Sequence, residues 1–236
     1  MFWGMLRGER ERKNSADRFH YCGCRNGGVS LVAVLLQPFL ALHLDDPPGR
    51  ITQYKLRNLT PQACTSLLSQ ANQRALIRTQ PVADSGGECP LRNVVRVRNF
   101  GPVSLNSSFL ASCPLALSSA LFISQQARPL TRRYTGSELT RIEHLGSFAC
   151  RNIYHRPDAR RSEHATAEAL DITAFGLANG ERVTVQNGWK ATKTQPWLKG
   201  MLAASCSYYG NSLGPEYNAA HASHFHLGMR GFGLCR

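Results

Sequence analysis

The cysteines constrain the fold of this 236-residue chain more than any other feature. Six of the eight cysteines follow an apolar stretch at residues 29–44, and the other two precede it. An even number of cysteines behind such a stretch predicts an exported, oxidised part held together by three disulfides. The alternative is a four-cysteine zinc site, but the exported part contains no CxxC pair.

Six cysteines can pair in many ways, and their spacing alone does not choose among them. Neighbouring segments of a chain usually lie side by side in the fold. On this basis we predict the pairs Cys64–Cys89, Cys113–Cys150 and Cys206–Cys235.

Residues 1–44 are predicted to be a basic N-terminal segment followed by a signal peptide or signal anchor. Residues 1–28 are basic and irregular, and residues 29–44 read VSLVAVLLQPFLALHL. Positive charge before a short apolar run is typical of an export signal. A buried core helix is the alternative, although Pro38 would interrupt it. No clear cleavage site follows, so secretion and inner-membrane association through residues 29–44 both remain open. Either places the protein in the periplasm or cell envelope.

The chain is strongly basic, with 28 Lys and Arg against 15 Asp and Glu and a formal net charge of +13. Such a balance favours an anionic partner: nucleic acid, an acidic membrane surface or a carboxylate-rich polymer. Helix-turn-helix and zinc-finger spacings are missing, and export also argues against a nucleic-acid partner. A serine hydrolase is disfavoured because no G-x-S-x-G motif occurs.

Residues 45–59 are predicted to be an extended linker, and residues 60–236 a single α+β domain with a small antiparallel sheet flanked by helices. The expected helices begin at Thr60-Pro61, at Ser112-Cys113-Pro114 and at residue 195. The expected strands are a hairpin around residues 95–105, two strands within 139–153 joined near Gly146, and strands at 167–175, 182–186 and 224–229.

Two groups of histidines are the candidates for a metal-binding or catalytic site. The first is an H-x6-D arrangement, His164 and Asp171, and the second is an HxxHxH arrangement, His221, His224 and His226. Two residues apart on a strand, His224 and His226 project to one face. A catalytic zinc site takes three protein ligands and leaves a position for water, so one histidine from each group with Asp171 would suffice. The alternatives are ordinary core or surface histidines, or an adventitious metal-binding tract near the chain end.

A resemblance to known enzymes lies in these same residues. SEHATAEALD is similar to the S-x-H-x-x-G-x-A-x-D motif of zinc peptidases that cut D-amino-acid bonds in peptidoglycan, among them D-alanyl-D-alanine carboxypeptidases. The lysostaphin-like endopeptidases share that metal site, and HASHFH resembles the ending of the penicillin-insensitive murein endopeptidase. The whole of residues 60–236 resembles the bacterial extensin-like C-terminal domain family through CPL, SCPLA, SFACRN, LGPEYN and HFH.

The resemblance implies that His164, Asp171 and His226 bind zinc and that His221 and His224 act in the active site. Two departures stand out. Ala167 replaces the glycine of the wider motif, and a histidine, His221, replaces the glutamate base of the carboxypeptidase branch. An endopeptidase is therefore favoured over a carboxypeptidase.

The implied function is zinc-dependent hydrolysis of peptidoglycan cross-links that involve D-alanine or diaminopimelate. Arg151 is the expected donor to the oxyanion or to a substrate carboxylate, and Asn218 is an expected substrate-binding residue. Glu163 and Glu168 are expected to be supporting or surface groups rather than bases. The alternative is a noncatalytic cell-wall binding or scaffold module that retains a structural metal site.

Overall fold

The computed structural model describes residues 41–231 and 233–236. The predicted export signal falls mostly on residues 1–40, outside the described residues. None of the described helices has the length and apolar character that a membrane crossing requires.

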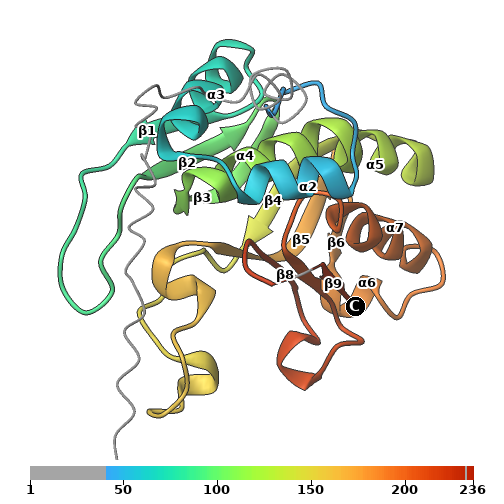
Figure 1. The fold of residues 1–236 in the computed structure, drawn as a ribbon. Helices are drawn as coiled ribbons and strands as arrows, with labels where there is room; N and C mark the ends of the chain where they lie inside the picture. Colours follow the sequence, from blue (N-terminus) through green and yellow to red (C-terminus); the bar gives the residue numbers. More distant parts are fainter. Residues whose placement is uncertain (1–40, 232) are drawn as a thin grey trace, which may run out of the picture. The chain divides into compact units, whose positions relative to one another are not determined.

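The described chain forms a mixed α/β domain around one nine-stranded sheet (Figure 1). The strand order is β1-β2-β3-β4-β5-β8-β7-β9, with β6 paired to β5. All neighbouring strands are antiparallel except β3–β4 and β7–β9, so the sheet is larger and more mixed than the one predicted. The strands are β1 (Arg78–Pro81), β2 (Val94–Phe100), β3 (Val103–Ser112), β4 (Leu139–His144), β5 (Ala169–Leu177), β6 (Arg182–Thr184), β7 (Asn211–Leu213), β8 (Phe225–Gly228) and β9 (Leu234–Cys235).

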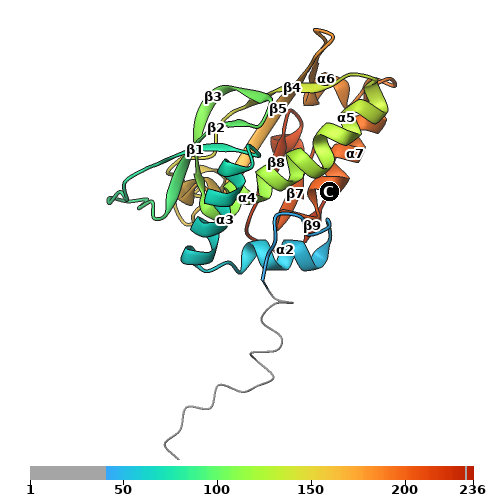
Figure 2. The same ribbon diagram turned by 90° about the horizontal axis from the view of Figure 1, so that it is seen from above.

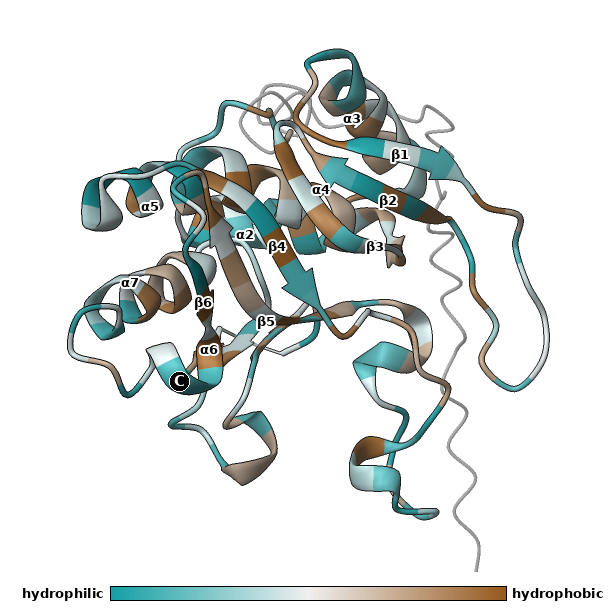
Figure 3. Cartoon of the chain, turned by 180° about the vertical axis from the view of Figure 1, so that it is seen from behind, coloured by the Kyte–Doolittle hydropathy of each residue, from teal (hydrophilic) through white to brown (hydrophobic). Residues whose placement is uncertain are grey.

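Helices cover one side of this sheet. They are α2 (Arg50–Arg57), α3 (Pro61–Gln73), α4 (Cys113–Phe122), α5 (Arg128–Thr135), α6 (Val185–Gly188) and α7 (Gln195–Ser205), with a π-helical turn between α4 and α5. Seen from above, α3, α4, α5 and α7 gather on one side of β1 to β5 (Figure 2). Along β2 to β4, hydrophobic and hydrophilic residues alternate (Figure 3), as expected for strands with one buried face.

The predicted helix starts at Thr60 and Ser112 are confirmed. The side chain of Thr60 accepts a hydrogen bond from Ala63 N, and that of Ser112 accepts one from Leu115 N. Each cap is followed by a proline in the first turn, where the missing N–H costs nothing.

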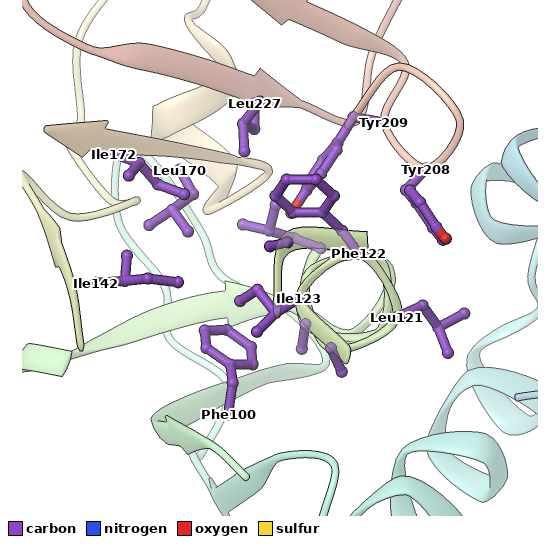
Figure 4. Close-up of a cluster of buried hydrophobic side chains, with 14 of the residues drawn as sticks. Phe100, Leu121, Phe122, Ile123, Ile142, Leu170, Ile172, Tyr208, Tyr209 and Leu227 are labelled. Atoms are coloured by element: carbon purple, nitrogen blue, oxygen red, sulfur yellow. The ribbon is translucent and has the colours of Figure 1, made fainter. Parts of the chain in front are cut away.

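The core is built around α4, whose residues are almost all buried. Phe122 of α4 and Ile123 after it lie close to side chains of the sheet, whereas Leu121 points away from the sheet toward the blue-green helices (Figure 4). These sheet residues are Ile142, Leu170, Ile172 and Leu227. An apolar helix packed on all sides fixes the sheet rigidly, which matters because β5 and β8 both carry candidate site residues.

The predicted extended linker at 45–59 is wrong. Helix α2 occupies residues 50–57, its Leu56 is fully buried, and its Gln53 donates a 3.1 Å hydrogen bond to the Cys206 carbonyl. Leu42 and Leu44, from the end of the predicted apolar segment, are also buried in the core. The folded domain therefore starts before residue 45.

Of the predicted disulfides, only Cys206–Cys235 is confirmed. Cys64 bonds Cys113 and Cys89 bonds Cys150, in place of the predicted pairs Cys64–Cys89 and Cys113–Cys150. The reason is topological. Helices α3 and α4 pack together although β1 to β3 separate them in the sequence, so spatial neighbours are not sequence neighbours here.

The second strand predicted within 139–153 is also absent from this described segment. After β4 the chain turns at Gly146, whose φ of 101° favours glycine. It then runs beside the start of β5: Leu145 N donates to Asp171 O at 2.9 Å, and Ala149 N donates to His164 O at 3.0 Å. These backbone bonds hold residues 145–149 against the candidate site.

Candidate metal centre

The predicted ligands meet where β5 pairs with β8. Asp171 of β5 lies directly opposite His226 of β8 in the antiparallel register, which brings their side chains within about 5 Å at Cβ. His164 comes from a short 3-10 turn, Glu163–Thr166, that leads into β5. All three line a cleft of about 610 Å³.

The three side chains are close enough to share one ion. His164 Nε2 lies 3.2 Å from Asp171 Oδ2, and His226 Nδ1 lies 3.0 Å from Asp171 Oδ1. One ligand atom from each residue falls within 4.8 Å of the others. Ligand atoms around a tetrahedral zinc with bonds of about 2.0–2.1 Å are about 3.4 Å apart, so small side-chain shifts satisfy that geometry.

Hydrogen bonds on the far side of each ring set its tautomer. His164 Nδ1 lies 3.1 Å from the Ser147 carbonyl, an obligate acceptor, so Nδ1 carries the proton. His226 Nε2 lies 3.3 Å from a Glu163 carboxylate oxygen, which likewise assigns its proton to Nε2. The lone pairs of His164 Nε2 and His226 Nδ1 then both point at the Asp171 carboxylate. Three electron-pair donors facing one gap need a cation or an extra proton between them, and two imidazole nitrogens with one carboxylate oxygen suit zinc.

The pKa shifts of Asp171 and His226 also indicate that the site favours a positive charge. Burial tends to raise the pKa of Asp171, but His164 and His226 together hold it well below its usual range. Burial tends to lower the pKa of His226, but Asp171 and Glu163 raise it to about 9. Without a metal, the site keeps an extra proton on His226.

Glu163 is the outer partner of His226, in line with the supporting role expected for it. Its carboxylate also accepts hydrogen bonds from Asn211 Nδ2 at 2.9 Å and from Arg230 N at 2.6 Å. It fits against β8 only because residue 228 is glycine: a Cβ there would lie 2.5 Å from Glu163 Oε2. Gly228 and Asn211 were missed from the sequence, although Gly228 stands two residues after His226, on the same face of the strand.

His221 and His224 lie beside this cluster but differ in their anchoring. His221 Nδ1 bonds Asn218 Oδ1 at 2.7 Å. Burial and the neighbouring histidines lower the pKa of His221 to about 4, so its imidazole is neutral at pH 7. Burial also lowers the pKa of His224. The Nδ1 atom of His224 is buried without a partner in the described chain, and its Nε2 lies 3.7 Å from Asp171.

The remaining predicted residues occupy different places. Arg151 lines the cleft, next to the Cys89–Cys150 disulfide, and forms no ion pair with a described residue. Asn218 is engaged by protein groups, since its amide nitrogen donates to Tyr154 Oη at 3.2 Å in addition to the bond with His221. Glu168 bonds Arg230 at 2.7 Å and is thus a supporting group. Tyr154, another residue of the cleft wall, was not predicted.

Comparison with known proteins gives one match. The family model described as extensin-like protein C-terminus matches residues 62–236. No curated protein and no solved structure shows significant similarity to the chain.

Proposed function

The chain belongs to the extensin-like protein C-terminus family, and we propose that it is a zinc-dependent hydrolase of peptidoglycan peptides. The observation that carries this proposal is the convergence of His164, Asp171 and His226 in an open cleft, with both rings turned so that a lone pair faces the gap. The relation to D-amino-acid peptidases of the cell wall, suggested by SEHATAEALD and HASHFH, belongs to the same proposal.

His164, Asp171 and His226 would hold the ion, with Ser147 and Glu163 orienting the two rings. A zinc ion held there would supply polarisation of the scissile carbonyl and a lowered pKa, toward about 7, for its bound water. The protein keeps the three ligand atoms aligned, because hydrogen bonds from outer partners set the orientation of each imidazole ring and the basicity of its ligand nitrogen.

His221 is the group we propose to move the proton. Its Nδ1 is committed to Asn218, and its Nε2 has no hydrogen-bond partner in the described part of the chain. Nε2 can therefore accept a proton from the attacking water and return it to the leaving amine. His224 lines the same cleft with its Nδ1 unsatisfied, and it is the second histidine to test.

The charge of the cleft suits an anionic substrate. Arg151 and Arg160 line it without an ion-pair partner among the described residues, whereas Arg161 and Arg230 are paired with Glu88 and Glu168. Peptide stems with D-alanine or diaminopimelate carry free carboxylates that such arginines can hold. Arg151 is the proposed donor to a substrate carboxylate or to the oxyanion. Three disulfides suit the oxidising periplasm or cell envelope.

One observation favours the scaffold alternative. Among the residues lining the cleft, the only carboxylates are Asp171 and Glu163, and both are already engaged. A wall-binding module with a structural metal needs no base, whereas the hydrolase must rely on a histidine.

The two functions are separated by incubating the full-length protein with whole sacculi, with zinc or with chelator, followed by mass analysis of released muropeptides. The hydrolase predicts new fragments with zinc and none with chelator. His221→Ala is expected to lower the rate by about 10²–10⁴-fold while sacculus binding is retained. The matched control is His43→Ala, an exposed histidine remote from the cleft lining. Unchanged muropeptides with zinc-loaded wild-type protein would leave the scaffold as the function.

A further inference from the structure

Tyr154, Asn218 and His221 form a chain of hydrogen bonds at the wall of the cleft. We propose that Asn218 and Tyr154 are positioning residues, which hold the His221 imidazole in the Nδ1–H tautomer with Nε2 open to the cleft. The catalytic consequence rests on the proposed hydrolase function, but the tautomer itself does not.

The first link sets the proton on His221. Asn218 Oδ1 is 2.7 Å from His221 Nδ1, and Asn218 Nδ2 is 3.2 Å from the Tyr154 hydroxyl. In the structure the amide nitrogen of Asn218 faces the Tyr154 hydroxyl, which can accept from it, and the amide oxygen faces His221. An amide oxygen only accepts hydrogen bonds, so the His221 nitrogen facing it must carry the proton.

The second link is steric. The ring of His221 sits among three other rings, with centroid distances of 5.3 Å to Tyr217, 5.3 Å to His224 and 5.6 Å to His226. Turning the ring over by 180° would present a carbon to Asn218 Oδ1 and lose the hydrogen bond. Packing and hydrogen bonding therefore select the same orientation of His221.

The third link is the loop that carries Tyr154. Tyr154 has φ 53° and ψ 25°, and His155 has φ 59°. Two consecutive non-glycine residues in the left-handed region are costly and persist only where the surroundings over-determine them. Here Asn152 Nδ2 donates to the Arg156 and Pro157 carbonyls, and the disulfide Cys89–Cys150 secures the start of the loop.

The strained loop reaches across to the chain segment that carries His221. Residues 152–161 and 214–224 project from the same end of the sheet (Figures 1 and 3). Both segments are fully described, and the Tyr154–Asn218 bond is the one hydrogen bond that joins them. Tyr154 is half exposed, so burial of its ring does not account for its strained backbone. The bond to Asn218 adds to the Asn152 hydrogen bonds and the disulfide that hold this loop.

The test uses the full-length chain labelled with ¹⁵N-histidine. Long-range ¹⁵N–¹H spectra at neutral pH report which nitrogen of His221 carries the proton, and the His221→Gln variant identifies its signals. The wild type is expected to show the Nδ1–H form. Asn218→Ala should convert His221 to a mixture or to the Nε2–H form, whereas Asn218→Asp, which keeps an oxygen acceptor, should retain Nδ1–H. Tyr154→Phe should give a partial change.

Kinetics on a soluble cross-linked muropeptide dimer supply the second readout. Asn218→Ala should lower kcat by about 10–100-fold with KM little changed, and Asn218→Asp should restore most of it. Tyr154→Phe should cause a smaller fall in the same direction. The matched controls are Asn58→Ala and Tyr134→Phe, exposed residues outside the cleft lining, which should leave both readouts unchanged.

The outcomes separate this inference from the proposed function. A wild-type His221 with its proton on Nε2, or an unchanged tautomer in Asn218→Ala, overturns the positioning inference even if the dimer is hydrolysed. If the His221 tautomer changes as expected in Asn218→Ala but the wild type does not hydrolyse the muropeptide dimer, the positioning inference is supported and the proposed hydrolase function is overturned.

Discussion

Gly228→Ala is expected to weaken zinc binding without touching a ligand. A Cβ at position 228 would lie 2.5 and 2.6 Å from the two Glu163 carboxylate oxygens and 2.7 Å from Asn211 Nδ2. Nonbonded heavy atoms pack at about 3.5 Å or more, so the carboxylate must retreat by about 1 Å. Its bond to His226 Nε2 is already 3.3 Å long and cannot absorb that movement.

The size of the effect follows from what the carboxylate does. Loss of an outer partner of a metal-bound histidine lowers affinity by about 10–100-fold, or about 1.4–2.7 kcal/mol. Competition against a chromophoric chelator, with the full-length protein, measures this directly. Glu163→Gln should weaken zinc binding in the same direction, because an amide is a poorer acceptor for the His226 N–H than a carboxylate.

The control is Gly86→Ala, where a Cβ would meet no atom within 4 Å. This variant should bind zinc like the wild type. The reasoning is refuted if Gly228→Ala also binds zinc with unchanged affinity while remaining folded by circular dichroism, because Glu163 would then have no influence on His226.

Three more predictions concern the ligands, a disulfide and a buried histidine. Asp171→Asn should reduce zinc affinity by more than the about 100-fold expected for an outer partner, as measured by the same competition. Replacing both Cys89 and Cys150 by serine removes a disulfide between residues 61 positions apart in the sequence. Because the unfolded chain then gains conformational freedom, the free energy of unfolding should fall by about 4 kcal/mol in urea titrations. Burial lowers the pKa of His144, so the unfolded chain takes up a proton below about pH 6.5 that the folded chain does not. Stability should therefore fall as the pH drops through that range, and less steeply in His144→Gln.

The proximity of His164, Asp171 and His226 was predictable in part from the spacing within the two histidine motifs. The expected strand at 224–229 is shorter in the structure: β8 is Phe225–Gly228, so His226 lies on it and His224 precedes it. Asp171 lies on the paired strand, in register with His226, so the two sequence motifs needed only that β5 and β8 be neighbours. The same local rules gave the helix caps at Thr60 and Ser112.

What failed depended on contacts between distant segments. The pairing of Cys64 with Cys113 follows from the packing of α3 on α4, which no spacing rule contains. The outer bond of His226 depends on Glu163, 63 residues away, and on the missing side chain of Gly228. A glycine required for the close approach of a carboxylate looks in the sequence like any other strand glycine.

Ala167 shows how a departure from a motif can leave the geometry of the candidate site unchanged. The zinc-peptidase motif that SEHATAEALD resembles has glycine at this position. In this chain φ is 53°, in the left-handed region where a Cβ costs about 1–2 kcal/mol. Here the methyl group is fully buried beside Leu91 and Val94, and burying one such group returns about 0.8 kcal/mol. Burial of the methyl group therefore offsets part of the backbone cost. Because Ala167 does not line the cleft, its methyl group leaves the space for an ion between His164 and Asp171 unchanged.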